Sequence, residues 1–261
     1  TAAAAAKSEN GTVSNKNQPE NQHGKKAATK ASIDLSIELK ENKTYNLSES
    51  TMKSLKILEK LLEDALLDIK QYANATISGK IKSNVAPLSS GLLEKKFLTA
   101  TKSAINSLLI EGADIYLTEF SHATKGNIRR QNDFILEYAS EWFNKLSKDI
   151  KTDTDSILSS DESITYKASM IQVKIERYRG RIQQFVDYIG HKTVNYGYLL
   201  TASYNQEGTV YIESDNGCGY CKAMADTRIS TKFLSDYEEK ALFYKMPPYH
   251  SNCKCQIRGG E

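Results

Sequence analysis

The chain has 261 residues, and its 35 Lys and Arg against 32 Asp and Glu give a formal net charge of +3. This near balance argues against a protein that coats nucleic acid over its whole surface, although local basic patches remain open. Only four prolines occur, which favours long uninterrupted helices. No apolar run reaches the roughly 18 residues that cross a bilayer. The sequence therefore predicts a polar, helix-rich protein with no membrane span.

The first part of the chain has the composition of a linker. Residues 1–31 carry almost no large apolar side chains, so we expect a flexible polar tail. The opening lacks both an initiator methionine and the apolar core of a signal peptide, which indicates processing or excision from a longer chain. Residues 33–39 then alternate between apolar and polar, which indicates a short strand or an irregular extended arm.

Apolar residues next recur every three or four positions, which predicts helices packed along one another with these residues as core. A first helix is expected from about residue 50. Further helices are expected at about 92–122, 132–150 and 163–204, with a polar capping loop at 152–163. We therefore predict a mainly α protein, an elongated bundle or set of helical hairpins. Residues 32–164 would form the helical region and residues 165–261 a C-terminal domain with a small α+β module.

A basic cluster lies on the last of these predicted helices, formed by Lys174, Arg177, Arg179 and Arg181. Charged runs on helices are usually solvated faces, and this is the favoured interpretation. The alternative is contact with DNA or with a partner protein, since lysine and arginine neutralise phosphates.

The C-terminal part carries a metal-binding pattern. After a predicted strand at 209–212 comes a C-x-x-C motif, and 28 residues later an H-x-x-C-x-C motif. Two thiols two residues apart in a tight turn can face one ion, and a second pair from a distant segment completes a tetrahedral Zn²⁺ site. The candidate ligands are Cys218, Cys221, His250, Cys253 and Cys255.

Five donors compete for four places in that site. Either four thiolates bind with His250 beside them, or His250 and three thiolates bind; in both cases the closed shell is structural. Glycines beside Cys218 are expected to let the turn fold around the metal, and Pro247 and Pro248 to restrict the backbone before the second group. Disulfides and unliganded thiols are the alternatives.

Motifs of several zinc enzymes are absent. No histidine begins the H-x-E of nucleobase deaminases or the H-E-x-x-H of metalloproteases. A Cys–His catalytic pair formed by His250 and Cys253 would rest on sequence proximity alone. We therefore assign no catalytic residue.

Two segments resemble a known family: Cys218-x-x-Cys221-Lys222-Ala223-Met224 and Pro248-Tyr249-His250-x-x-Cys253-Lys254-Cys255. They are similar to the C-terminal domain of the phage Mu F-like minor head (head morphogenesis) proteins, over about residues 165–258. The preceding stretch also fits, through Arg181, Ile189, Thr193, Asn195 and Gly197. Two positions depart from the family pattern, since Asp226 replaces a frequent Gly and Lys254 a usual Arg.

The resemblance implies a structural, non-enzymatic component of a phage head. It would lie inside the capsid near the portal and contact portal or other capsid proteins and packaged double-stranded DNA. The expected location is the virion, or the bacterial cytoplasm during assembly. The alternative is the C-terminal portion of a secreted polymorphic toxin or effector, because similar domains also occur in such proteins.

Overall fold

The structure is a computed structural model that describes residues 47–80, 91–126, 133–206, 208–214, 218–250, 253 and 255–260. The predicted tail and the alternating stretch at 33–39 lie outside these residues. The described elements all belong to one compact unit that spans residues 42–261.

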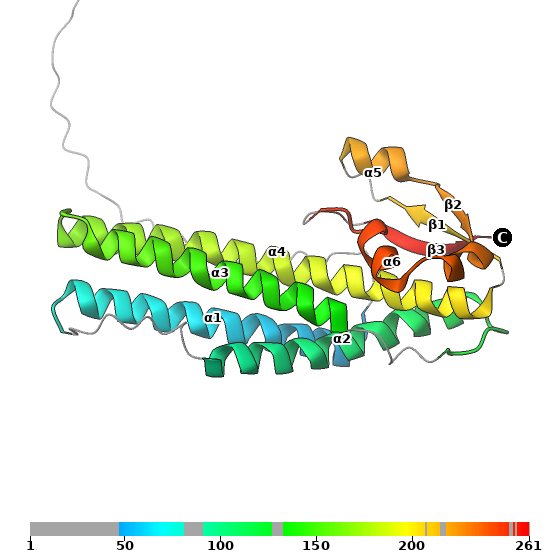
Figure 1. Cartoon of the computed structure of the whole chain (residues 1–261), viewed down its shortest axis with the longest axis horizontal. Helices are drawn as coiled ribbons and strands as arrows, with labels where there is room; N and C mark the ends of the chain where they lie inside the picture. Colours follow the sequence, from blue (N-terminus) through cyan, green and yellow to red (C-terminus); the bar gives the residue numbers. More distant parts are fainter. Residues whose placement is uncertain are drawn as a thin grey trace, which may run out of the picture. The chain divides into compact units, whose positions relative to one another are not determined.

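Four long helices run side by side in this unit (Figure 1). They are α1 (Glu49–Ile77), α2 (Gly91–Glu119), α3 (Asp133–Ser159) and α4 (Ile164–Asn205). All four contribute buried apolar side chains to one core, which confirms the interpretation of the periodic stripes. The expected boundary near residue 164 falls between α3 and α4, and both helices pack into that same core.

Helix α3 is longer than predicted. It extends to Ser159, so the expectation of a loop at 152–163 is wrong for most of that stretch. The polar residues remain helical because α4 supplies partners for them: Asp153 accepts bonds from Lys174 at 2.8 Å and from the Tyr178 hydroxyl. The expected cap is confirmed, since Ser163 accepts a hydrogen bond from the backbone N–H of Tyr166 at 3.2 Å.

Helices α2 and α4 approach closely at two glycines. A Cβ atom on Gly112 would lie 2.0 Å from the carbonyl oxygen of Val194, and one on Gly197 would lie 2.3 Å from that of Leu109. Backbone atoms therefore occupy the space that any larger residue would need. Gly180, nearer the start of α4, has no such neighbour, and α4 continues without interruption through it.

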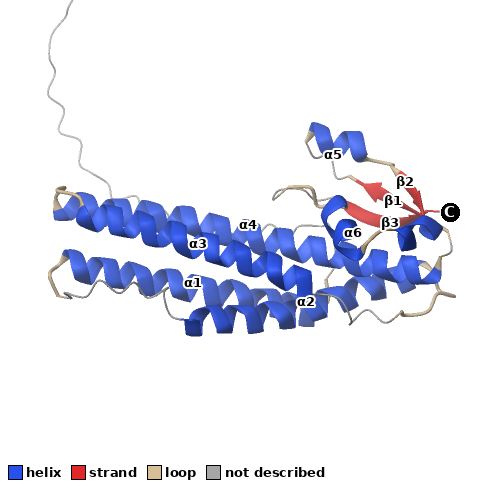
Figure 2. Cartoon of the chain, in the orientation of Figure 1, coloured by secondary structure: helices blue, strands red, loops and turns tan. Residues whose placement is uncertain are grey.

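A small antiparallel sheet follows α4 (Figure 2). Its strand order is β2-β1-β3, with β1 at Thr209–Glu213, β2 at Arg228–Ser230 and β3 at Gln256–Gly260. Between the strands lie α5 (Gly219–Met224), the 3₁₀ helix η3 (Thr231–Asp236) and α6 (Glu239–Lys245). α4 contacts η3, α6 and β3. The predicted fold class, mainly helical with a small C-terminal α+β module, is confirmed.

Glu119, the last residue of α2, joins the helices to the sheet. Its carboxylate accepts hydrogen bonds from the Tyr198 hydroxyl, from the backbone N–H of Gly259 at 2.8 Å and from the Arg258 guanidinium at 3.2 Å. A single side chain thus connects α2, α4 and β3.

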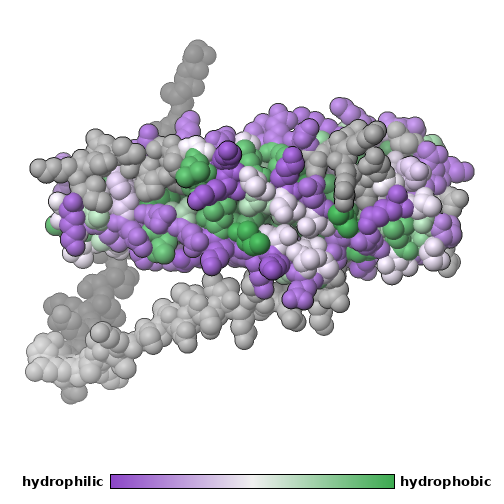
Figure 3. All heavy atoms as spheres, turned by 90° about the horizontal axis from the view of Figure 1, so that it is seen from below, coloured by the Kyte–Doolittle hydropathy of each residue, from purple (hydrophilic) through white to green (hydrophobic). Residues whose placement is uncertain are grey.

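The surface mixes polar and apolar residues. On the face seen from below, apolar areas alternate with hydrophilic side chains (Figure 3). Among the helices that the structure describes, none combines the length and the hydropathy of a membrane span.

Candidate metal centre

The first pair of thiols lies at the start of α5. Cys218 is the N-cap residue and Cys221 lies in the first turn, where the Lys222 N–H donates to the Cys218 carbonyl at 3.0 Å. Residues three apart share one face of a helix, so both sulfur atoms point the same way. They lie 3.6 Å apart.

The second group of donors lies between α6 and β3. The Cys253 N–H donates to the His250 carbonyl at 2.9 Å, a turn that brings the two side chains to one side. Cys255 immediately precedes β3. Cys253 and Cys255 are both buried, whereas His250 is half-buried.

The two groups meet. The imidazole Nε2 of His250 lies 3.1 Å from the Cys218 sulfur and 3.3 Å from the Cys221 sulfur, and the Cys221 and Cys253 sulfurs are 3.5 Å apart. In a tetrahedral zinc site, bond lengths of about 2.0–2.3 Å place neighbouring donors about 3.5–3.8 Å apart. The separations between donor atoms in this cluster are close to those of a tetrahedral zinc site.

The donors form two triads that share Cys221. One consists of Cys218, Cys221 and His250, the other of Cys221, Cys253 and Cys255, and within each triad the donor atoms lie within 4.8 Å of one another. This Cys/His cluster could hold a metal ion, and a four-ligand shell would draw on both triads. All four cysteines are free thiols, with no disulfide between them.

The thiols differ in acidity. The backbone N–H and then the thiol of Cys221 lower the pKa of Cys218 to about 7. Burial raises the pKa of Cys221, and burial also raises that of Cys255. Thiolates are the form that binds metal, and a bound cation favours deprotonation of the buried thiols.

Lys192 of α4 fixes the segment that carries His250. The side chain is only 2% exposed, and its ammonium donates to the carbonyls of Tyr244, Met246 and Pro248, the last at 3.0 Å. Burial lowers the pKa of Lys192 to about 8, while the nearby Cys253 thiol acts in the opposite direction. The sequence interpretation missed this residue. The sequence feature that could have identified it is a lysine at a position in line with the buried residues of α4.

Asn195, one turn further along α4, completes this support. Its side-chain amide donates to the carbonyls of Pro247 at 2.9 Å and of Cys255 at 3.1 Å, and its oxygen accepts the N–H of Ile257 at 3.1 Å. Both ends of the ligand segment are thus bonded to one helix. Such outer contacts orient metal ligands and affect how tightly the ion binds.

Two local expectations are refined by the geometry. Gly219 is part of α5, and a Cβ atom on it would have no neighbour within 4 Å, so the thiols are arranged by a helix start and this glycine is not needed for space. Asp226 has a φ of 61°, in the left-handed region that glycine adopts easily and aspartate tolerates.

The basic cluster is largely paired with carboxylates. Lys174 bonds Asp153, Arg181 bonds Asp149 at 2.9 Å, and Arg179 pairs with Glu176 and, at 3.7 Å, with Glu63. The fourth member, Arg177, is exposed. These pairs link α4 to α3 and to α1, and contact of the cluster with DNA stays a prediction.

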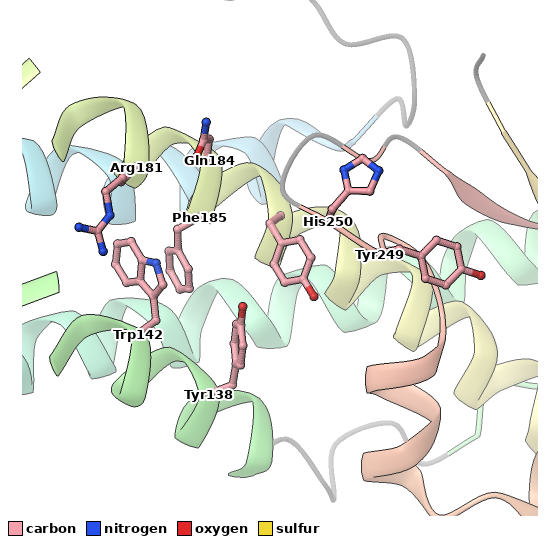
Figure 4. Close-up of a pocket in the computed structure, with 8 residues that line it drawn as sticks. Tyr138, Trp142, Arg181, Gln184, Phe185, Tyr249 and His250 are labelled. Atoms are coloured by element: carbon pink, nitrogen blue, oxygen red, sulfur yellow. The ribbon is translucent and has the colours of Figure 1, made fainter. Parts of the chain in front are cut away.

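An aromatic pocket adjoins the metal centre (Figure 4). It has a volume of about 330 Å³ and lies between α3, α4 and the segment of His250. Arg181, Trp142 and Phe185 lie together at one end, and His250 and Tyr249 at the other (Figure 4). His250 therefore belongs both to the pocket wall and to the metal cluster.

Comparison with protein family models, with curated proteins and with solved structures finds no match to this chain. The similarity to the Mu F-like proteins therefore depends on the residues quoted above, above all on the five Cys and His donors.

Proposed function

We propose that the cluster is a structural Zn²⁺ site that holds the C-terminal module together. The observation that carries this proposal is the convergence of five soft donors from two segments on Cys221. Thiolate and imidazole ligands suit zinc, and a shell of four protein ligands leaves no place for a substrate water.

As the ligand set we propose Cys218, Cys221, His250 and Cys253. The first three form one triad, and Cys253 is the donor of the second triad with a short separation, 3.5 Å, from Cys221. Cys255, the buried third member of that triad, would remain beside the metal as a thiol. This choice selects between the two alternatives that the motif leaves open.

Metal analysis of the purified full chain tests both the zinc site and the proposed ligand set. We expect one equivalent of zinc per chain. Cys253→Ser should lose it and loosen the module, because metal binding and local folding are coupled. Cys255→Ser is the matched control: it is equally buried, two residues away, and should retain the zinc. Loss of zinc from Cys255→Ser with retention in Cys253→Ser would reverse the ligand assignment, and wild-type protein without zinc would refute the site.

We further propose that the protein is a minor head component of the Mu F-like kind. The support is the motif, together with a site that has the features of a structural centre and a fold in which a long helical region carries the module. Portal or other capsid proteins, and packaged double-stranded DNA, would be its partners.

The protein should co-purify with portal-containing heads from cells in which such heads assemble. Cys221→Ser should be absent from them if the folded module is needed for incorporation, because loss of the metal would unfold it. Lys240→Met, a surface change in the same module, serves as the control and should still be incorporated. Heads that assemble with their portal but never contain the wild-type protein would contradict this proposal.

A further inference from the structure

A second hollow lies along the same seam between α3 and α4 as the aromatic pocket. Arg181 lines both hollows, and the pairs Tyr138–Tyr188, Trp142–Phe185 and Asp149–Arg181 follow one another along two antiparallel helices. From Tyr188 to Arg177 the helix rises about 16 Å. We call this seam the α3–α4 groove, and its principal side chains are Tyr138, Trp142, Lys148, Arg177, Arg181 and Tyr188.

One end of the groove offers flat rings. Trp142 stacks on buried Phe185, with ring centroids 3.8 Å apart and planes at 14°, and is itself only partly buried. Tyr138 and Tyr188, with centroids 6.1 Å apart, extend the aromatic wall. A tryptophan held rigidly by a ring behind it is a ready surface for stacking another planar group.

The other end carries a surplus of positive charge. The second hollow, of about 430 Å³, is lined by cations and by the carboxylates of Asp149 and Asp153. Arg181 pairs with Asp149, and Lys174 with Asp153. Lys148 and Arg177 are exposed, and no ion pair within 4 Å joins either of them to a carboxylate of the described residues, although Arg177 acts on Asp153 at longer range. An anionic group placed here would meet two exposed cations.

We propose that the α3–α4 groove binds single-stranded nucleic acid, with a base stacked at Trp142 and phosphates at Lys148 and Arg177. Stacking rings beside cations that follow a backbone are the features of a site for single strands, since every base has a face to stack. Bases inside a duplex already stack on one another and present no free face to this wall. The site goes beyond the proposed structural role and does not depend on it.

Trp142 is the only tryptophan of the chain, so its fluorescence reports on the groove directly. The experiment titrates the full zinc-loaded protein with short oligo(dT), with oligo(rU) of equal length and with a duplex of the same length. We expect both single strands to quench the fluorescence and to bind with an affinity that falls with salt. A preference for one single strand identifies the source as DNA or RNA, and the duplex should quench the Trp142 fluorescence little, whether or not it binds elsewhere on the protein.

The double change Lys148→Gln and Arg177→Gln should raise Kd about tenfold and reduce the salt slope by about 1.4, because two phosphate contacts are lost. The control removes two exposed lysines of α1, Lys53→Gln and Lys60→Gln, and should leave Kd within about twofold at moderate salt. The proposal is overturned if neither single strand quenches Trp142, if the duplex quenches Trp142 as strongly as they do, or if both double variants weaken binding equally. Zinc content and incorporation into heads are measured separately, so failure of one proposal is distinguishable from failure of the other.

Discussion

Replacing Lys192 with Met should weaken metal binding by about 10–100-fold, although Lys192 is no ligand, because contacts of this kind orient the ligands. The substitution keeps the length of the buried side chain but removes the ammonium that bonds three carbonyls in the segment before His250. The bonds to Met246 and Pro248 are buried, so their carbonyls would lose this donor where water does not replace it. The free energy of unfolding should fall by roughly 3 kcal/mol.

Competition with a chromophoric chelator measures the metal affinity, and denaturant unfolding of the metal-loaded protein measures the stability. Lys240→Met removes an equal charge from the exposed surface of α6, where the lysine pairs with Glu137 at 3.7 Å, and should change neither quantity appreciably. If Lys192→Met binds metal as tightly as the wild type, Lys192 does not position the site.

Gly197→Ala should lower the free energy of unfolding nearly as much as Lys192→Met, although it adds a single methyl group. The new Cβ would lie 2.3 Å from the Leu109 carbonyl oxygen and 2.9 Å from its carbonyl carbon, both of them backbone atoms that cannot rotate away. α2 and α4 would have to separate. We expect a loss of roughly 2–3 kcal/mol, or a fall in Tm of roughly 5–10 °C.

The same helix provides the control for this prediction. Gly180→Ala is made where no atom lies within 4 Å of the added methyl group, and alanine is the better helix former. Its expected effect is stabilisation by roughly 0.5–1 kcal/mol. Substitution of these two glycines of α4 by alanine should therefore shift Tm in opposite directions in the same calorimetric experiment. Equal effects at both positions would contradict a role for Gly197 in helix packing.

Much of the helical fold was predictable because its signal is local. Apolar periodicity gave all four long helices, and Ser163 marked the start of the last one. The end of α3 was not predictable in this way, since a run of Asp, Ser and Thr has the composition of a loop. Its helical state depends on bonds from Lys174 and Tyr178, which belong to another helix.

The donor cluster was also predictable in its members but not in its support. Cysteine spacing identifies ligand types regardless of the backbone that presents them. The structure then places Cys218 and Cys221 on a helix start where a glycine-lined turn was expected. Lys192 was missed because a single buried lysine in a helix has no motif, and only the fold shows which carbonyls it reaches. The groove likewise depends on two helices whose aromatic residues are far apart in sequence.

The bond between Glu119 and Gly259 spans 140 positions of the chain. During synthesis on a ribosome, α2 is therefore complete long before the strand that its last residue holds. The face of α4 that packs against α6, η3 and β3 remains exposed to solvent until those elements have been synthesised. Contacts of such long range slow folding and couple distant segments. We expect the helices to reach their final packing only after β3 has been made, so that helices and sheet fold together as one cooperative unit.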